Sequence, residues 1–343
     1  AVIAHAQGIS SSILGTVYDT ARAVVPNVEV LLTNEITGAT LTAASNEVGL
    51  FRFPNLLPGR YSIAVKRQGF KSYQQTGIEL STSETRDLGA IVLEVGAIVE
   101  QVTVTAAVTP LQVASSEKSL LVTGTQLNTL ALQGRDFLGL MRLVPGVIDT
   151  AASRDTTGGS ALNNIFIHGG RANQKNYTID GVTAADIGWS VYMHTEPNME
   201  TIAEVRVLTS NYQAEFGRNS GGAISVITKS GQREFHGSGY WNVRNEVLNA
   251  NDFFRNRSGV PKPPYRYNVA GLSVGGPIYI PKKFNTDRNK LFFFFSQEYT
   301  RRRVDFGPLY RNMPTALERI SDFSRSFDTS GRLIPVKDPL TGS

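Results

Sequence analysis

Residues 9–95 alternate apolar and polar positions, with turn residues recurring about every 8–12 positions. This period of two is typical of half-buried β-strands, because successive side chains of a strand point to opposite faces. Short strands at such regular spacing favour an all-β sandwich of about seven strands. The strands with the clearest pattern are Ile13–Tyr18, Val28–Thr33, Thr40–Ala44, Gly49–Phe53, Tyr61–Val65 and Ala90–Val95.

A linker over residues 96–110 follows the predicted sandwich and contains one β-prone run. This run consists of Glu100, Gln101, Val102, Thr103, Val104, Thr105 and Ala106, and is called the heptad below. An unpaired strand in a linker is normally an aggregation hazard. We therefore interpret the heptad as a free edge that a partner protein pairs with through main-chain hydrogen bonds.

Residues 111–230 combine two patterns. In Thr125–Leu132 and Asp136–Leu143 the apolar residues recur at spacings of three and four, which predicts helical segments. Short apolar strands rich in Gly and Asn turns fill the rest of the segment, so it is predicted to be an α/β domain.

Residues 231–343 contain three longer alternating strands, expected at Gly237–Glu246, Asn268–Gly276 and Lys290–Arg303. Outer-membrane barrel strands have about ten residues, apolar side chains toward lipid and polar ones toward the lumen. The outward set would be Gly239, Trp241, Val243, Ala270, Leu272, Val274, Leu291, Phe293, Phe295 and Tyr299. The inward set would be Ser238, Tyr240, Asn242, Arg244, Ser273, Ser296, Glu298 and Thr300. A soluble three-stranded sheet would alternate in the same way, but the aromatic-rich outward face favours the barrel.

The connections between these strands alternate in length, as in barrels with long outer loops and short periplasmic turns. The long connections, residues 247–267 and 304–343, are therefore expected outside the cell. The short connection, residues 277–289, is expected in the periplasm. Three strands cannot close a barrel, and an open edge in lipid leaves backbone groups without partners. We therefore expect a truncated barrel in an N-terminal fragment of a larger protein. Ala4-His5-Ala6 resembles a signal-peptidase site, so residues 1–8 are expected to be a signal-peptide remnant.

The charge is unevenly distributed. The net charge is +5, but residues 231–343 hold 18 basic and 10 acidic residues, so an anionic partner would meet the last third. Arg301, Arg302 and Arg303 are candidates to bind lipopolysaccharide phosphates, with a solvated strand end as an equal alternative. The basic residues are not interleaved with aromatic residues as in nucleic-acid domains, so no nucleic-acid partner is expected.

Catalytic, metal and cofactor sites find no support in the sequence. Cysteine is absent, and the four histidines do not form a metal-binding pattern such as H-x-x-E with a third distant His. Neither G-x-S-x-G nor a phosphate-binding glycine motif is present. We expect no catalytic residue, no metal and no cofactor.

The N-terminal segment resembles the carboxypeptidase-regulatory-like (transthyretin-like) domain family. The resemblance rests on Gly15-x-Val17-x-Asp19, Pro26, Gly49-x-Phe51-x-Phe53, Leu56, Pro58-Gly59-x-Tyr61 and Gly69-Phe70. It implies an accessory β-sandwich.

Residues 111–230 resemble the plug domain of TonB-dependent outer-membrane receptors, and the heptad is similar to the TonB box that precedes it. The plug resemblance rests on Pro145, Gly146, Gly169, Asn173, Asp180, Gly181, Glu204, Gly221 and Gly222. His168 stands where many plugs have Arg. Leu208-Thr209-Ser210 replaces a common Gly-Pro turn. These departures and the sandwich indicate the Oar-like branch.

This resemblance implies a Gram-negative outer-membrane receptor, with plug and sandwich on the periplasmic side. Its implied partners are the periplasmic domain of TonB, outer-membrane lipid and an unidentified transported ligand. The alternative from another class is a secreted or surface-attached adhesive protein without transport, which would not need the heptad.

Overall fold

The computed structural model describes residues 11–96, 101–105, 116–130, 132–151, 161–186, 188, 192–213, 216–217, 219–304, 313–328, 330–336 and 340. The expected signal-peptide remnant, Glu100 and Ala106 lie outside these residues. The chain divides into two compact units, Ala1–Trp241 with Val269–Tyr299, and Asn242–Asn268 with Thr300–Ser343. Strands dominate throughout, so the mainly β fold class predicted from the sequence is confirmed.

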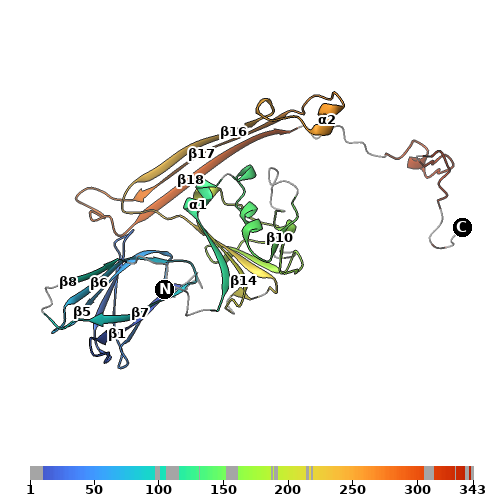
Figure 1. Cartoon of the computed structure of the whole chain (residues 1–343). Helices are drawn as coiled ribbons and strands as arrows, with labels where there is room; N and C mark the ends of the chain where they lie inside the picture. Colours follow the sequence, from blue (N-terminus) through green and yellow to red (C-terminus); the bar gives the residue numbers. More distant parts are fainter. Residues whose placement is uncertain are drawn as a thin grey trace. The chain divides into compact units, whose positions relative to one another are not determined.

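The N-terminal segment is a sandwich of two sheets (Figure 1). One sheet has the order β4-β1-β7 and the other β3-β2-β5-β6-β8. Its core is built from inward-facing residues such as Ile13, Phe51, Ile63 and Ile91, each at most 1% exposed. The strands are β1 (Ser11–Asp19), β2 (Glu29–Asn34), β3 (Thr40–Ala44), β4 (Leu50–Leu56), β5 (Gly59–Lys66), β6 (Ser72–Leu80), β7 (Thr85–Leu93) and β8 (Gln101–Thr105).

Strand β8 consists of the five central residues of the heptad. It pairs in parallel with β6, with Ser72 opposite Gln101 and Thr76 opposite Thr105. The heptad is expected from its sequence to be a free strand in a linker. In the structure its central residues instead form the edge strand of the five-stranded sheet. The local Val/Thr pattern is the same for a free strand and a paired one, because pairing depends on a distant partner.

The α/β domain is built on a five-stranded sheet of order β13-β12-β15-β14-β9. Its core includes Leu127, Phe137, Leu138, Met141 and Tyr177, all at most 2% exposed. The elements are β9 (Lys118–Thr123), α1 (Gly124–Thr129), η1 (Gln133–Arg135), η2 (Phe137–Leu143), β10 (Val147–Asp149), η3 (Ala161–Asn164), β11 (Ile165–Ile167), β12 (Lys175–Ile179), β13 (Val182–Thr183), η4 (Met199–Thr201), β14 (Ile202–Ser210) and β15 (Gly222–Thr228).

Both helical predictions need correction in detail. The first segment forms α1, which begins at a capping box between Thr123 and Gln126 and ends at Thr129. The second segment, Phe137–Leu143, is a 3₁₀ helix, whose N-cap Asp136 accepts from the Leu138 amide. Periodic spacing of three and four does not distinguish a 3₁₀ helix from an α-helix over so short a segment.

The last third forms the three-stranded sheet β16-β17-β18. The strands run His236–Asn245, Tyr265–Pro277 and Phe292–Val304. The short helices of this part of the chain are η6 (Glu246–Leu248), α2 (Phe253–Arg257) and η7 (Glu318–Ile320). Large apolar side chains predicted to face lipid are exposed, among them Trp241 at 72% and Tyr299 at 67%. Among the described residues, no helix has the length and apolarity to cross a bilayer.

Candidate functional site

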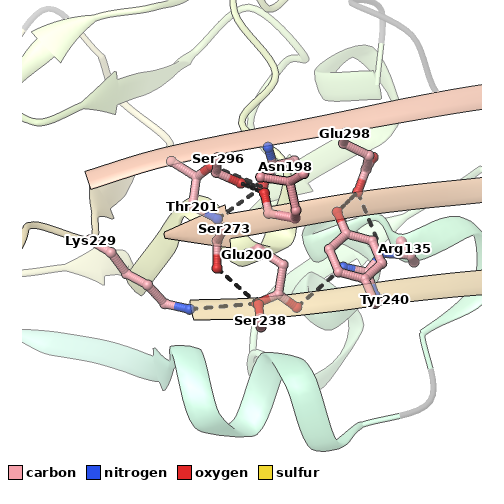
Figure 2. A network of polar contacts seen from close by, with 11 residues as sticks. Arg135, Asn198, Glu200, Thr201, Lys229, Ser238, Tyr240, Ser273, Ser296 and Glu298 are labelled. Atoms are coloured by element: carbon pink, nitrogen blue, oxygen red, sulfur yellow. Dashed lines mark hydrogen bonds and ion pairs between the residues drawn. The ribbon is translucent and has the colours of Figure 1, made fainter. Parts of the chain in front are cut away.

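Arg135 is the centre of a polar network between the α/β domain and the three-stranded sheet (Figure 2). Its guanidinium carbon lies 4.2 Å from the centre of the Tyr240 ring, a cation–π distance. Its nitrogens lie 3.6 Å from Glu200 Oε1 and 3.6 Å from Glu298 Oε2. At that separation the pairs are charge interactions rather than hydrogen bonds. Arg135 is thus held by charge and by the ring.

Directed hydrogen bonds complete the network. The Tyr240 hydroxyl donates to Glu298 Oε2 over 2.6 Å, and the Ser238 hydroxyl donates to Glu200 Oε2 over 3.2 Å. The Ser296 hydroxyl donates to Asn198 Oδ1 over 3.2 Å. Ser238 and Tyr240 are two positions apart on β16 and therefore share a face of the sheet. The same holds for Ser296 and Glu298 on β18. The polar face predicted from the sequence is the one that meets the α/β domain.

A short 3₁₀ turn positions the carboxylate of Glu200. Asn198 caps this turn, η4, by accepting from the Thr201 amide and hydroxyl, each over 2.9 Å. Lys229 Nζ lies 3.8 Å from Glu200 Oε2. Because η4 leads directly into β14, a displacement of that strand would carry Glu200 with it.

A second polar cluster joins β14 to the sandwich, and is called the Thr82 joint. The Thr82 amide donates to Glu204 Oε1 over 2.7 Å, and the Thr82 hydroxyl donates to the same oxygen. Arg206 donates to the Thr82 carbonyl and, over 2.7 Å, to Glu117 Oε1. The side chains of Arg206 and Glu117 are 5% and 1% exposed. Burial raises the pKa of the Glu204 carboxyl. The hydrogen bonds from Thr82 lower this pKa, but burial has the larger effect.

Several glycines of the plug resemblance lie next to strand ends, before β10, after β11 and at the start of β15. Gly146 has φ +84°, and a Cβ there would meet the His168 ring. A Cβ on Gly221 would come within 2.5 Å of the Gln174 carbonyl oxygen, and one on Gly222 within 2.6 Å of the Leu208 carbonyl oxygen. The backbones therefore approach too closely for a side chain. Nearby positions are Pro145 after η2, Gly169 in a turn, and exposed Asn173 in the turn before β12.

Asp180 and Gly181 form the turn at the other end of β12. Asp180 has φ +49° and Gly181 φ +80°. The Asp180 carboxylate accepts from the Thr228 amide over 2.9 Å and from the Thr228 hydroxyl over 2.7 Å. Asp180 therefore ties the turn to the last residue of β15, a structural role.

The buried Lys175 gives the α/β domain a pH signature. Its ammonium donates to the carbonyls of Ile165 and Ala172, and burial lowers its pKa to about 8. Between that value and its ordinary pKa the unfolded chain binds more protons, so stability rises with pH in this window. We expect about 1–2 kcal/mol of added unfolding free energy between pH 8 and pH 9.5.

Denaturant titrations of the wild-type chain and Lys175→Met, at several pH values, would measure this gain. Lys175→Met should lose it, and Lys118→Met, which removes an exposed lysine of the same domain, should keep it. Equal pH dependence in all three proteins would contradict the assignment.

The remaining predicted site residues are not brought together with these clusters. Arg301, Arg302 and Arg303 are exposed near the end of β18. The described part of the heptad is β8, in the sandwich. Within the described ranges no group of three or more His, Cys, Asp and Glu residues could hold a metal ion.

The partners that come from the α/β domain and the sandwich are not evident from the sequence. Arg135, Glu200 and Lys229 lie at the ends of short elements far apart in the chain, without a local motif. Thr82, Arg206 and Glu117 were missed for the same reason. A charged residue inside the apolar strand Ile202–Ser210 was the available signal for Arg206, since unpaired charges are rarely buried.

Comparisons with known proteins cover nearly the whole chain. The family "Carboxypeptidase regulatory-like domain" matches residues 12–94, "TonB-dependent Receptor Plug Domain" matches 112–224, and "Outer membrane beta barrel domain" matches 227–343. The TonB-dependent transporter Oar of Myxococcus xanthus is 28% identical over 308 residues, covering 85% of this chain. This chain spans 27% of the length of that relative.

Solved structures give weaker likenesses. The outer-membrane transporter YddB of Escherichia coli aligns with 47% of this chain and 24% of its own at TM-score 0.37 and 19% identity. The siderophore receptor PirA of Acinetobacter baumannii aligns with 53% of this chain and 24% of its own at TM-score 0.36 and 21% identity. With scores this low, neither alignment bears on the assignment.

The three matched families occur in the chain order predicted for an Oar-like receptor, and the curated relative has that name. The plug family and the curated relative are named for receptors and transporters, which are not a class of enzymes. The α/β domain is therefore a plug domain, and strands β16–β18 belong to outer-membrane barrel sequence. The chain belongs to the Oar-like TonB-dependent receptors of the outer membrane.

Proposed function

We propose that this chain is the gating and coupling part of a receptor that takes up an unidentified ligand across the outer membrane. The plug closes the lumen, and the periplasmic domain of TonB pairs with Glu100–Ala106. Force through that pairing rearranges the plug and admits the ligand. The plug and sandwich lie on the periplasmic side, and the chain catalyses no reaction.

The network around Arg135 is the observation that carries this proposal. A plug that must move needs contacts with the barrel strands that are specific but breakable. Arg135 meets Glu200 and Glu298 at 3.6 Å, longer than a hydrogen bond, and its side chain is 19% exposed. Pairs at this distance lack a directed hydrogen bond, so each is weaker than a hydrogen-bonded ion pair. The plug is thus held in register by several weak contacts that can be exchanged one by one.

The exposed Arg301–Arg303 run fits the outer-membrane setting as a contact for lipopolysaccharide phosphates. Guanidinium groups bind phosphates with two parallel hydrogen bonds. This contact would fix the barrel strand in the membrane and is independent of ligand uptake.

Capture of the periplasmic domain of TonB tests the coupling role. The full chain in detergent micelles should bind it, and a peptide of the sequence Glu100–Ala106 should compete. The same peptide with proline at the position of Val104 should not compete, because proline removes a backbone donor. The TonB preparation is first shown to bind a control receptor. If the same preparation does not bind this chain, the proposal is wrong.

A further inference from the structure

Strand β8 occupies one edge of a stable sheet and leaves its own outer edge unpaired among the described strands. The sheet order ends at β6-β8, and five consecutive residues of β8 face five of β6, with Gln74 opposite Thr103 at the centre. In a strand, the backbone groups of successive residues point alternately to the two sides. Pairing with β6 therefore uses the backbone N–H and C=O groups on one side of β8. The backbone groups on its other side point outward.

The sandwich behind this edge has its own core. Tyr61, Ile63 and Val65 of β5, the strand next to β6, are buried in the core between the two sheets. The sheet therefore holds the backbone of β8 in an extended conformation. A peptide that is already extended loses less conformational entropy when another strand joins it.

We propose that the carboxypeptidase-regulatory-like sandwich presents the coupling strand, so that an extended strand of TonB adds to the outer edge of β8 while β8 remains paired with β6. This inference rests on the proposed function, because it takes TonB as the partner. It assigns the sandwich a binding role: its sheet and the heptad form a single surface for a sixth strand. Strand addition to a preformed sheet edge is a common mode of peptide recognition.

The joint at Thr82 makes this arrangement mechanically useful. Thr82 follows the end of β6 by two residues and holds Glu204 and Arg206 of plug strand β14. A strand that pulls on β8 while it stays on β6 therefore pulls on the sandwich, and through Thr82 on the plug.

A disulfide between β6 and β8 tests the inference directly, because the chain has no cysteine of its own. The variant Gln74→Cys/Thr103→Cys places the two thiols on residues that face each other. Binding of the periplasmic domain of TonB is measured by calorimetry with the full chain, oxidised and reduced. The dissociation constant should be unchanged or lower after oxidation, since the locked strand is the binding form.

The matched control is Gln74→Cys/Ala64→Cys. Ala64 faces the same Gln74 from β5, so this bridge lies on the other side of β6 and does not touch β8. If oxidation raises the dissociation constant more than about threefold in the Thr103 variant alone, TonB takes the strand away from β6 and the inference is wrong. The proposed function would survive that result.

Hydrogen exchange of the unmodified chain gives a second readout. With β8 in place, amides of β6 should exchange no faster when TonB is bound. Faster exchange over Ser72–Leu80 would show that β6 has become an edge strand, and would overturn the inference. If neither the reduced variant nor the unmodified chain binds TonB, the proposed function fails as well.

Discussion

Replacement of Arg135 by alanine should loosen the contact between the plug and the barrel strands, with about tenfold faster amide exchange over Asn198–Thr201. The change removes the cation over the Tyr240 ring, an interaction of about 0.5–2 kcal/mol. It also leaves Glu200 and Glu298 without the positive charge that lies 3.6 Å from each. Because the Arg135 side chain is only 19% exposed, salt should screen these pairs less than it screens surface pairs, and most of the effect should persist in high salt. Exchange is measured with the full chain in detergent micelles.

Arg142→Ala provides the matched control. Arg142 is another plug arginine, which pairs with Asp149 at 2.9 Å and donates to the Ala151 carbonyl, all within the plug. Its loss should leave exchange at Asn198–Thr201 unchanged. Similar acceleration in both variants would mean that the plug has lost stability in general, and the role given to Arg135 would be wrong.

The sequence predicted the faces of the barrel strands well, and the reason is local. The side chain alternation of a strand is fixed by its geometry, so Ser238 and Tyr240 on one side and Trp241 on the other follow from position alone. Strand β6 was not located in advance, because most of its side chains are polar and only half-buried. Its place in the sheet depends on β5 and β8, which its own residues do not reveal.

Of the network around Arg135, only the side chains of the barrel strands can be placed from the sequence. Ser296 and Glu298 were assigned to the lumen by their alternation, whereas Arg135 stands in a three-residue turn with a φ of +55°. No periodic pattern marks such a residue. Glu204 was singled out by the resemblance to plug domains, but its contact with Thr82 joins residues 122 positions apart. Contacts of this kind depend on how domains pack, which a single sequence does not encode locally.

The Thr82 joint should produce the largest stability change. Arg206→Met removes the guanidinium that pairs with Glu117 at 2.7 Å, and leaves a carboxylate whose side chain is 1% exposed. Removing one member of a buried ion pair costs about 3–5 kcal/mol, because the remaining charge stays buried and has lost the opposite charge beside it. Thermal or denaturant unfolding of the full chain measures this loss.

The double variant Arg206→Met/Glu117→Gln separates charge from packing. Replacing both members of a buried pair by neutral side chains of similar size is often nearly neutral, so the double variant should regain most of the loss. Glu117→Gln alone should cost less than Arg206→Met, because Gln still accepts a hydrogen bond from the guanidinium. A double-mutant cycle then gives the coupling energy between Arg206 and Glu117.

Additive losses of stability in the two single variants, with no recovery in the double variant, would contradict the pairing. If the double variant regains stability, the plug side of the Thr82 joint depends on the buried charge pair between Arg206 and Glu117.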